Sequence, residues 1–201
     1  MEYKIKRKLV SEIFHLLNKN SYFKSNDYIV NVSFEETNKF STKIKRPSDK
    51  KRELIVKYPT QNNDREFYDK LEKYLKDEYT FDLFIYSFKN DMDMIETCTI
   101  FSILHEFGHV IEYIDRLNNG GDYLNRDEMI ELSRYWEVSK IQNLDERFYY
   151  YRKIDKEAIA DRNAIDIMKK FSNELKTIIR VSWLLCHDTL INYCYTYLNF
   201  N

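Results

Sequence analysis

At 201 residues and a formal net charge of −1, the chain is long enough for one well-cored domain and carries no charge bias toward nucleic acid or anionic membranes. Only three Gly and two Pro predict a mostly helical protein with few tight turns. No run of about 18 apolar residues occurs, so we expect no membrane span. The polar start at Met1 and the odd count of three cysteines predict a cytoplasmic protein with reduced thiols.

The first ninety residues mix helix and strand patterns. Apolar residues at helical spacing predict helices at 3–20 and at 64–74, with Asp64 as the N-cap of the second. Residues 36–51 are polar and rich in lysine, which predicts a mobile loop or a wide hairpin tip. β-branched and aromatic residues predict three strands, at 28–35, 53–58 and 80–88. We therefore expect a small antiparallel sheet in the region 28–88, within an α+β fold.

A long helix is predicted from Asn90 or Asp91 to about Arg116. Apolar residues cover most of its circumference, which is typical of a helix buried in the core. Within it stands His105-Glu106-Phe107-Gly108-His109, the pattern H-E-x-x-H. Positions i and i+4 lie on one face of a helix, so both histidines can bind one metal ion.

Glu106 follows the first histidine, where its carboxylate can reach a water molecule on that metal. Two ligands and a general base in this order are the arrangement of a zinc peptidase. Burial strengthens this interpretation, because buried polar groups without partners are costly and a metal would supply the partner. The alternative is that the histidines only form hydrogen bonds to neighbouring backbone.

Downstream of the motif, residues 118–122 predict a break, and residues 126–140 predict a helix. That helix is either a lid or cleft wall for the site or plain core packing. Residues 173–199 predict a long C-terminal helix that completes the core. We expect residues 1–201 to form a single domain, with the metal-site helices at 90–170 and the last helix at 172–199.

The third ligand is predicted to be Glu157, which follows His109 by 48 residues (157 − 109). Asp161, at i+4, is placed to accept the free N–H of a ligand histidine and to fix its tautomer. Two acids at this spacing repel each other, which favours a nearby cation. The alanines at 158, 160 and 164 make this helix slim enough to pack against Gly108. Weaker alternatives for the third ligand are Asp166, Glu174 and His187.

H-E-F-G-H followed by E-A-I-A-D-R-N-A resembles the gluzincin class of zinc peptidases, and within it the ImmA/IrrE family. The match covers roughly residues 95–170 and strictly only the two motifs. The resemblance implies a zincin-like fold and Zn²⁺ held by His105, His109 and Glu157. It also implies Glu106 as the catalytic base and Asp161 as the acid behind a ligand histidine. Members of that family are cytoplasmic metallopeptidases, common in phages and mobile elements, and several act on repressor proteins.

The residues thus predict a zinc-dependent endopeptidase with a specific intracellular protein as substrate, and neither a membrane nor nucleic acid as partner. Tyr151 and His187 are candidate donors to the oxyanion of the tetrahedral intermediate, with Tyr149, Tyr150 and Arg152 also in reach along the sequence. Two alternatives remain open. One is a zinc-bearing protein that binds or inhibits a partner without cleaving it, and the other is a metal-free helical interaction module.

Overall fold

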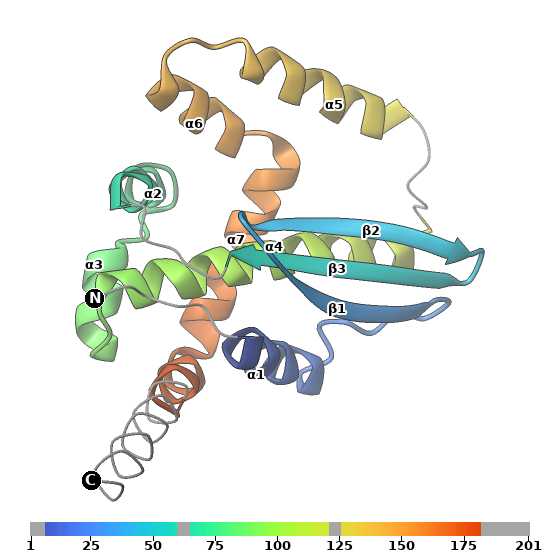
Figure 1. Cartoon of the computed structure of the whole chain (residues 1–201), viewed down its shortest axis with the longest axis horizontal. Helices are drawn as coiled ribbons and strands as arrows, with labels where there is room; N and C mark the ends of the chain where they lie inside the picture. The colour runs from blue at the N-terminus through green and yellow to red at the C-terminus, as the bar shows by residue number, and fades with distance from the viewer. Residues whose placement is uncertain (1–6, 60–64, 121–125, 182–201) are drawn as a thin grey trace, which may run out of the picture.

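The computed structural model describes residues 7–59, 65–120 and 126–181, which form a mostly helical α+β fold (Figure 1). The α+β prediction is confirmed. The strands are β1 (Ile29–Thr37), β2 (Ser41–Ser48) and β3 (Lys51–Pro59). The helices are α1 (Arg7–Lys19), α2 (Arg65–Tyr79), α3 (Leu83–Asn90), α4 (Met94–Asn118), α5 (Arg126–Ser139), α6 (Leu144–Arg152) and α7 (Asp155–Lys170), after which residues 172–181 are also helical.

The sheet has the strand order β1-β3-β2, with β3 in the centre. β2 and β3 form an antiparallel hairpin, whereas β1 runs parallel to β3 with Ile29 opposite Lys51. The predicted antiparallel sheet is therefore wrong in one of its two pairings, and the sheet is mixed. β1 and β2 follow each other in the chain but lie on opposite sides of β3, so the chain passes across the end of the sheet between them.

Two of the predicted elements differ from the structure. The segment 36–51, expected as a loop, contains β2, because pairing with the apolar strand β3 stabilises a strand that its own polar residues do not favour. The predicted strand 80–88 is instead helix α3. There the Asp82 carboxylate accepts a hydrogen bond of 2.8 Å from the backbone N–H of Ile85, which caps the helix and offsets the β propensity of the aromatic residues.

Helix α4 is the buried centre of the fold, as predicted. It begins after a capping box in which Asp93 and Glu96 exchange side-chain-to-backbone hydrogen bonds, two or three residues later than the predicted start at Asn90 or Asp91. Nearly every residue from Thr97 to Leu117 is buried. The sheet and α7 both pack against α4, so this one helix joins the two parts of the molecule (Figure 1).

The remaining helices surround this centre. α5 and α6 lie side by side and lead into α7 (Figure 1). Of the predicted C-terminal helix, residues 172–181 are helical and bury Leu175 and Ile179, while the rest lies outside the described residues. The cap predicted at Asp64 also lies outside them. Across the described ranges, no helix is both long enough and apolar enough to cross a bilayer.

Candidate metal centre

The three predicted metal ligands lie together in the structure. One face of α4 presents His105 and His109 with their ring centroids 4.7 Å apart, as their i, i+4 spacing requires. α7 brings in the carboxylate of Glu157. Its Oε2 atom lies 3.1 Å from Nε2 of His105 and 3.6 Å from Nε2 of His109. All three side chains are buried, and one potential ligand atom from each lies within 4.8 Å of the other two.

These separations suit a tetrahedral metal ion. Bonds of about 2.0–2.1 Å from a tetrahedral zinc place neighbouring ligand atoms about 3.3 Å apart. The separations from Glu157 to the two histidines, 3.1 Å and 3.6 Å, lie on either side of that value. Two imidazoles and one carboxylate can thus bind a divalent cation while a fourth position stays open. The donor set alone does not distinguish zinc from other divalent metals that accept nitrogen and oxygen ligands.

A close helix crossing brings Glu157 to the histidines. A Cβ atom added to Gly108 would lie 2.6 Å from the carbonyl oxygen of Ala160 and 2.9 Å from its Cα, so α4 and α7 meet backbone to backbone. The side-chain amide of Asn163 stabilises this contact between the helices, because it donates a hydrogen bond of 3.2 Å to the Gly108 carbonyl oxygen. The expectation that the glycine and the alanines allow this approach is confirmed.

Asp161 lies directly behind His105. Its Oδ1 atom is 2.8 Å from Nδ1 of His105 and 3.1 Å from Nη2 of Arg152, which is itself buried. With Nδ1 donating to Asp161, the other ring nitrogen of His105 faces Glu157 at 3.1 Å, on the side where a metal would bind, and Nη1 of Arg152 lies 3.3 Å from the same nitrogen. This is the arrangement predicted for Asp161.

The charged groups around His105 and Glu157 shift the pKa values of both residues. Burial and the Arg152 guanidinium both lower the pKa of His105, but hydrogen bonds with Asp161 and Glu157 outweigh them and raise it to about 9. Burial alone would raise the pKa of Glu157, yet hydrogen bonds from His105 and His109 hold it far below its usual range. The opposite directions of these two pKa shifts mean that each group favours the charged form of the other.

Glu106, the predicted base, lies on the wall of a cavity of about 180 Å³ beside the ligands. The hydroxyl of Thr42, on strand β2, lies 2.9 Å from the carboxylate oxygen Oε2 of Glu106 and 3.0 Å from the backbone carbonyl oxygen of the same residue. The sheet therefore orients this carboxylate. The cavity is lined by Phe40, Ser41, Thr42, Ile44, Glu106, His109, Tyr135, Tyr151, Lys156 and Glu157.

Two tyrosines line the same cavity from the other side. Tyr135, on α5, donates a hydrogen bond of 2.7 Å to Oε1 of Glu157, the oxygen that does not face the histidines. Tyr151, at the end of α6, lies with its ring centroid 5.7 Å from that of Tyr135. Burial and the charge of Glu157 raise the pKa of both phenols, so both remain hydrogen-bond donors. Helix α5 thus forms a wall of the cavity, one of the two roles predicted for it.

The other candidate donors lie elsewhere. Tyr149 donates to Glu78 at 2.5 Å, and Arg152 is bound to Asp161 rather than lining the cavity. Tyr150 lines a different cavity, described next. His187 lies outside the described residues.

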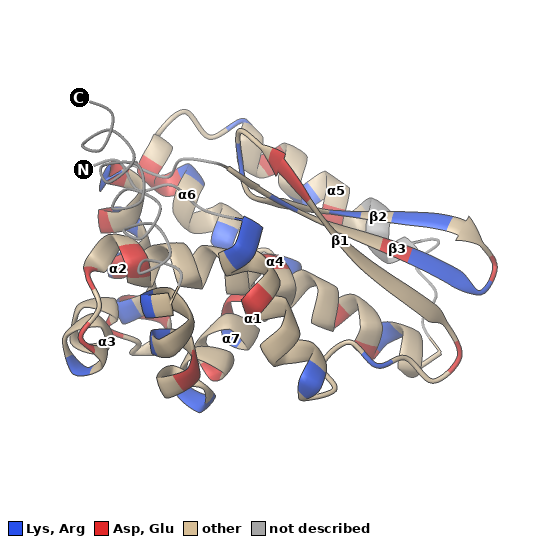
Figure 2. Cartoon of the chain, turned by 60° about the horizontal axis from the view of Figure 1, so that its bottom comes forward, with Lys and Arg blue, Asp and Glu red and all other residues tan. Residues whose placement is uncertain are grey.

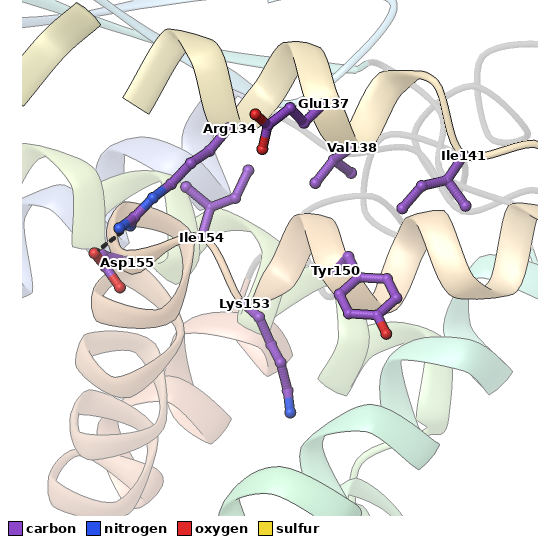
Figure 3. Close-up of a pocket in the computed structure, with 8 residues that line it drawn as sticks. All are labelled: Arg134, Glu137, Val138, Ile141, Tyr150, Lys153, Ile154 and Asp155. Carbon is purple, nitrogen blue, oxygen red and sulfur yellow. Dashed lines mark hydrogen bonds and ion pairs between the residues drawn. The ribbon is translucent and has the colours of Figure 1, made fainter. Parts of the chain in front are cut away.

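A second and larger cavity, of about 490 Å³, lies between α5, α6 and the start of α7 (Figure 3). Its lining is partly apolar, from Val138, Ile141 and Ile154. The ion pair between Arg134 and Asp155 crosses one side of it (Figure 3). None of the predicted ligands and no predicted base lines this cavity, so the candidate chemistry belongs to the smaller one.

Thr42 and Tyr135 are the site residues that sequence reasoning missed. Thr42 lies in the segment 36–51, which is expected as a loop, and Tyr135 lies in the predicted helix 126–140 with nothing in the sequence to mark it as a site residue. Neither lies at a fixed spacing from the two motifs, so no local pattern marks them. Comparison of the chain with protein-family models, curated proteins and solved structures finds no match. The assignment of the site therefore rests on its own residues and their geometry.

Proposed function

We propose that this protein is a zinc-dependent endopeptidase of the gluzincin type, with a zincin-like core, that hydrolyses a peptide bond in a specific intracellular protein. The observation that carries the proposal is the convergence of five predicted residues in one cluster, of which Glu106, His109 and Glu157 line the smaller cavity. His105, His109 and Glu157 offer three ligand atoms, Asp161 orients one of the histidines, and Glu106 lies beside them. No part of this set comes from a match to a known protein.

A zinc ion held by these three ligands would lower the pKa of an attacking water and polarise the substrate carbonyl. Glu106 would accept the proton of that water and later return it to the leaving amine. The hydrogen bond from Thr42 holds one carboxylate oxygen of Glu106, so the other is available for proton transfer. Glu106 therefore serves as the general base, and afterwards as the general acid.

The oxyanion of the tetrahedral intermediate requires a donor that keeps its proton at neutral pH. Tyr151 meets this need, because it lines the cavity and its pKa is raised. Tyr151 also interacts with Glu157, but the short hydrogen bond of 2.7 Å comes from Tyr135, so the role proposed for Tyr135 is to hold that ligand in place. Between the two, Tyr151 is the donor proposed for catalysis.

The test compares wild type with Glu106→Gln, each loaded with zinc, on an internally quenched peptide library. We expect both proteins to hold about one zinc and only wild type to cleave, with a rate loss of at least about a hundredfold in the variant. Glu112→Gln is the matched control, since Glu112 is also buried on α4 but does not line the cavity. Equal cleavage by wild type and Glu106→Gln would refute the assigned base. Zinc binding without cleavage by wild type would favour a non-proteolytic binding protein.

A further inference from the structure

The β2–β3 hairpin concentrates positive charge in a chain that is otherwise acidic. Six of the ten residues from Lys43 to Arg52 are Lys or Arg, and only Asp49 is acidic, whereas the whole chain has a net charge of −1. Figure 2 shows basic residues following β2 and the turn into β3. Five of the six have exposed side chains: Lys43, Lys45, Arg46, Lys50 and Lys51. We refer to these five residues as the basic hairpin.

The sixth basic residue makes the turn rigid. Arg52 is 2% exposed, and its Nη1 atom donates to the carbonyl oxygens of Ser48, Asp49 and Lys51 at 2.9–3.0 Å. Its guanidinium also lies 4.5 Å from the ring centroid of Tyr28, beside the first residue of β1. A turn held by these contacts presents its lysines in a preformed arrangement, which lowers the entropic cost of binding a partner.

The same strand also reaches the candidate metal centre. Thr42 and Ile44 line the cavity from one face of β2, and Lys43 and Lys45 alternate with them on the opposite face. Ser41, at the start of the strand, also lines the cavity. Lys156 adds a positive charge to the cavity wall. Residues in a strand advance about 3.3 Å each, so the basic hairpin begins one residue from the cavity and extends away from it.

We propose that the basic hairpin recognises an acidic segment of the protein substrate, next to the bond that is cleaved. This inference rests on the proposed peptidase function and names the class of its substrate. β2 is an edge strand of the sheet, so a polypeptide that enters the cavity and extends along this edge places alternate side chains on the opposite face, beside Lys43 and Lys45. There Asp or Glu is favoured and Lys or Arg is repelled. Glu53, 3.7 Å from Lys45, and Glu35, 3.5 Å from Lys57, break up the positive charge of the sheet. This interruption favours a short acidic peptide over a continuous phosphate backbone.

Binding is tested apart from cleavage, with zinc-loaded Glu106→Gln and fluorescein-labelled peptides. One peptide alternates Glu with Ser, a second has Gln in place of each Glu, and a DNA duplex is the third probe. We expect the Glu peptide to bind at least about tenfold more tightly than the Gln peptide. This preference is expected to weaken as the salt concentration rises from about 50 mM to about 300 mM, because salt screens exposed charges.

The decisive variants are Lys43→Gln/Lys45→Gln and the charge reversal Lys43→Glu/Lys45→Glu, both in the Glu106→Gln background. We expect them to lose the preference for the Glu peptide, with the larger loss in the charge reversal. The matched control is Lys73→Glu/Lys89→Glu, which changes two exposed lysines on α2 and α3, away from the sheet (Figure 1). Zinc content and thermal unfolding of each variant show that the fold is intact.

The outcomes separate this inference from the proposed function. Equal binding of the Glu and Gln peptides, or an equal loss in the control variant, overturns the acidic-segment proposal whether or not wild type cleaves peptides. Binding of the duplex but not of the Glu peptide overturns it in favour of nucleic acid. A lysine-dependent preference for the Glu peptide supports recognition by the hairpin, even if wild type proves unable to cleave and the peptidase proposal fails.

Discussion

Gly108 and Ala160 touch backbone to backbone, at the point where the motif helix α4 crosses the third-ligand helix α7. A methyl group at Gly108 would lie 2.6 Å from the Ala160 carbonyl oxygen, and a backbone atom at that distance cannot move without its helix. Glu157 lies one turn before Ala160 on the same helix. The crossing therefore sets the distance between the histidines and their third partner.

Gly108→Ala is expected to destabilise the protein and to weaken zinc binding, although alanine favours helix formation by about 1 kcal/mol over glycine. Overpacking against a backbone costs about 1–3 kcal/mol and would push α7 away. Urea unfolding and zinc competition against a chelating dye measure the two effects. Gly120→Ala is the control, since a Cβ there meets open space at a φ of +78° and strains only a turn. Unchanged zinc affinity in Gly108→Ala would contradict the role given to the crossing.

Asp161→Asn is expected to lower zinc affinity by about 10–100-fold while the stoichiometry stays near one. The amide cannot accept the Nδ1–H of His105 as strongly, and it no longer neutralises Arg152. Isothermal titration with zinc provides the measurement. Asp166→Asn, on the exposed face of the same helix, is expected to bind zinc as wild type does. Equal losses in both variants would show that the effect comes from net charge rather than from the contact with His105.

Tyr135→Phe is expected to weaken zinc binding by about tenfold, because the hydrogen bond to Oε1 of Glu157 holds a buried ionised ligand in place. Tyr151→Phe is expected to act differently, with zinc affinity retained and peptide cleavage reduced, since Tyr151 is the proposed oxyanion donor. Tyr150→Phe, on the same helix as Tyr151 but lining the other cavity, serves as the reference for both. If Tyr151→Phe cleaves at the wild-type rate, another group stabilises the oxyanion.

Cys98, within α4, is expected to resist alkylation in the folded protein. Burial raises the pKa of its thiol to about 12, and only the thiolate reacts. Iodoacetamide at about pH 8.5 should therefore modify Cys98 only after unfolding, as peptide mass mapping can show. Rapid labelling of Cys98 in the native protein would mean that α4 opens to solvent readily.

The raised pKa of the Cys98 thiol also makes the free energy of unfolding depend on pH. The thiol has its ordinary pKa of 9.0 when unfolded and about 12 when folded, so between these values the unfolded chain binds fewer protons. The contribution of Cys98 to the free energy of unfolding is therefore full below pH 9.0 and decreases as the pH rises toward about 12. Comparing wild type with Cys98→Ala in urea at both ends of this range isolates the contribution. An equal pH dependence in the two proteins would contradict it.

The sequence was most informative where the chemistry depends on helical spacing. His105 and His109, and likewise Glu157 and Asp161, share a face because they stand four residues apart, and that much can be read without a structure. Gly108 could also be interpreted, since a glycine inside a buried helix has a cost that a close approach explains. These positions predict the ligand cluster before any tertiary contact is known.

Contacts between distant segments could not be predicted in this way. Thr42 reaches Glu106 from a strand that is stabilised by its pairing with β3, and Tyr135 reaches Glu157 because α5 passes close to the first turn of α7. The parallel pairing of β1 with β3 also depends on tertiary packing, since the strand pattern alone specifies no direction. For α3 the sequence does contain a local helix signal, the N-cap residue Asp82. The β propensity of the aromatic residues that follow it favoured the incorrect prediction of a strand.

The central claim is a three-ligand metal centre made of His105, His109 and Glu157. Elemental analysis of the purified protein, beside His109→Ala, Glu157→Ala and the control Asp166→Ala, tests it most directly. We predict about one zinc per chain in wild type and in Asp166→Ala, and none in the other two variants. Zinc retained in Glu157→Ala would show that the third ligand is wrong, and a wild-type protein that takes up no zinc even when it is offered would contradict the metal centre altogether.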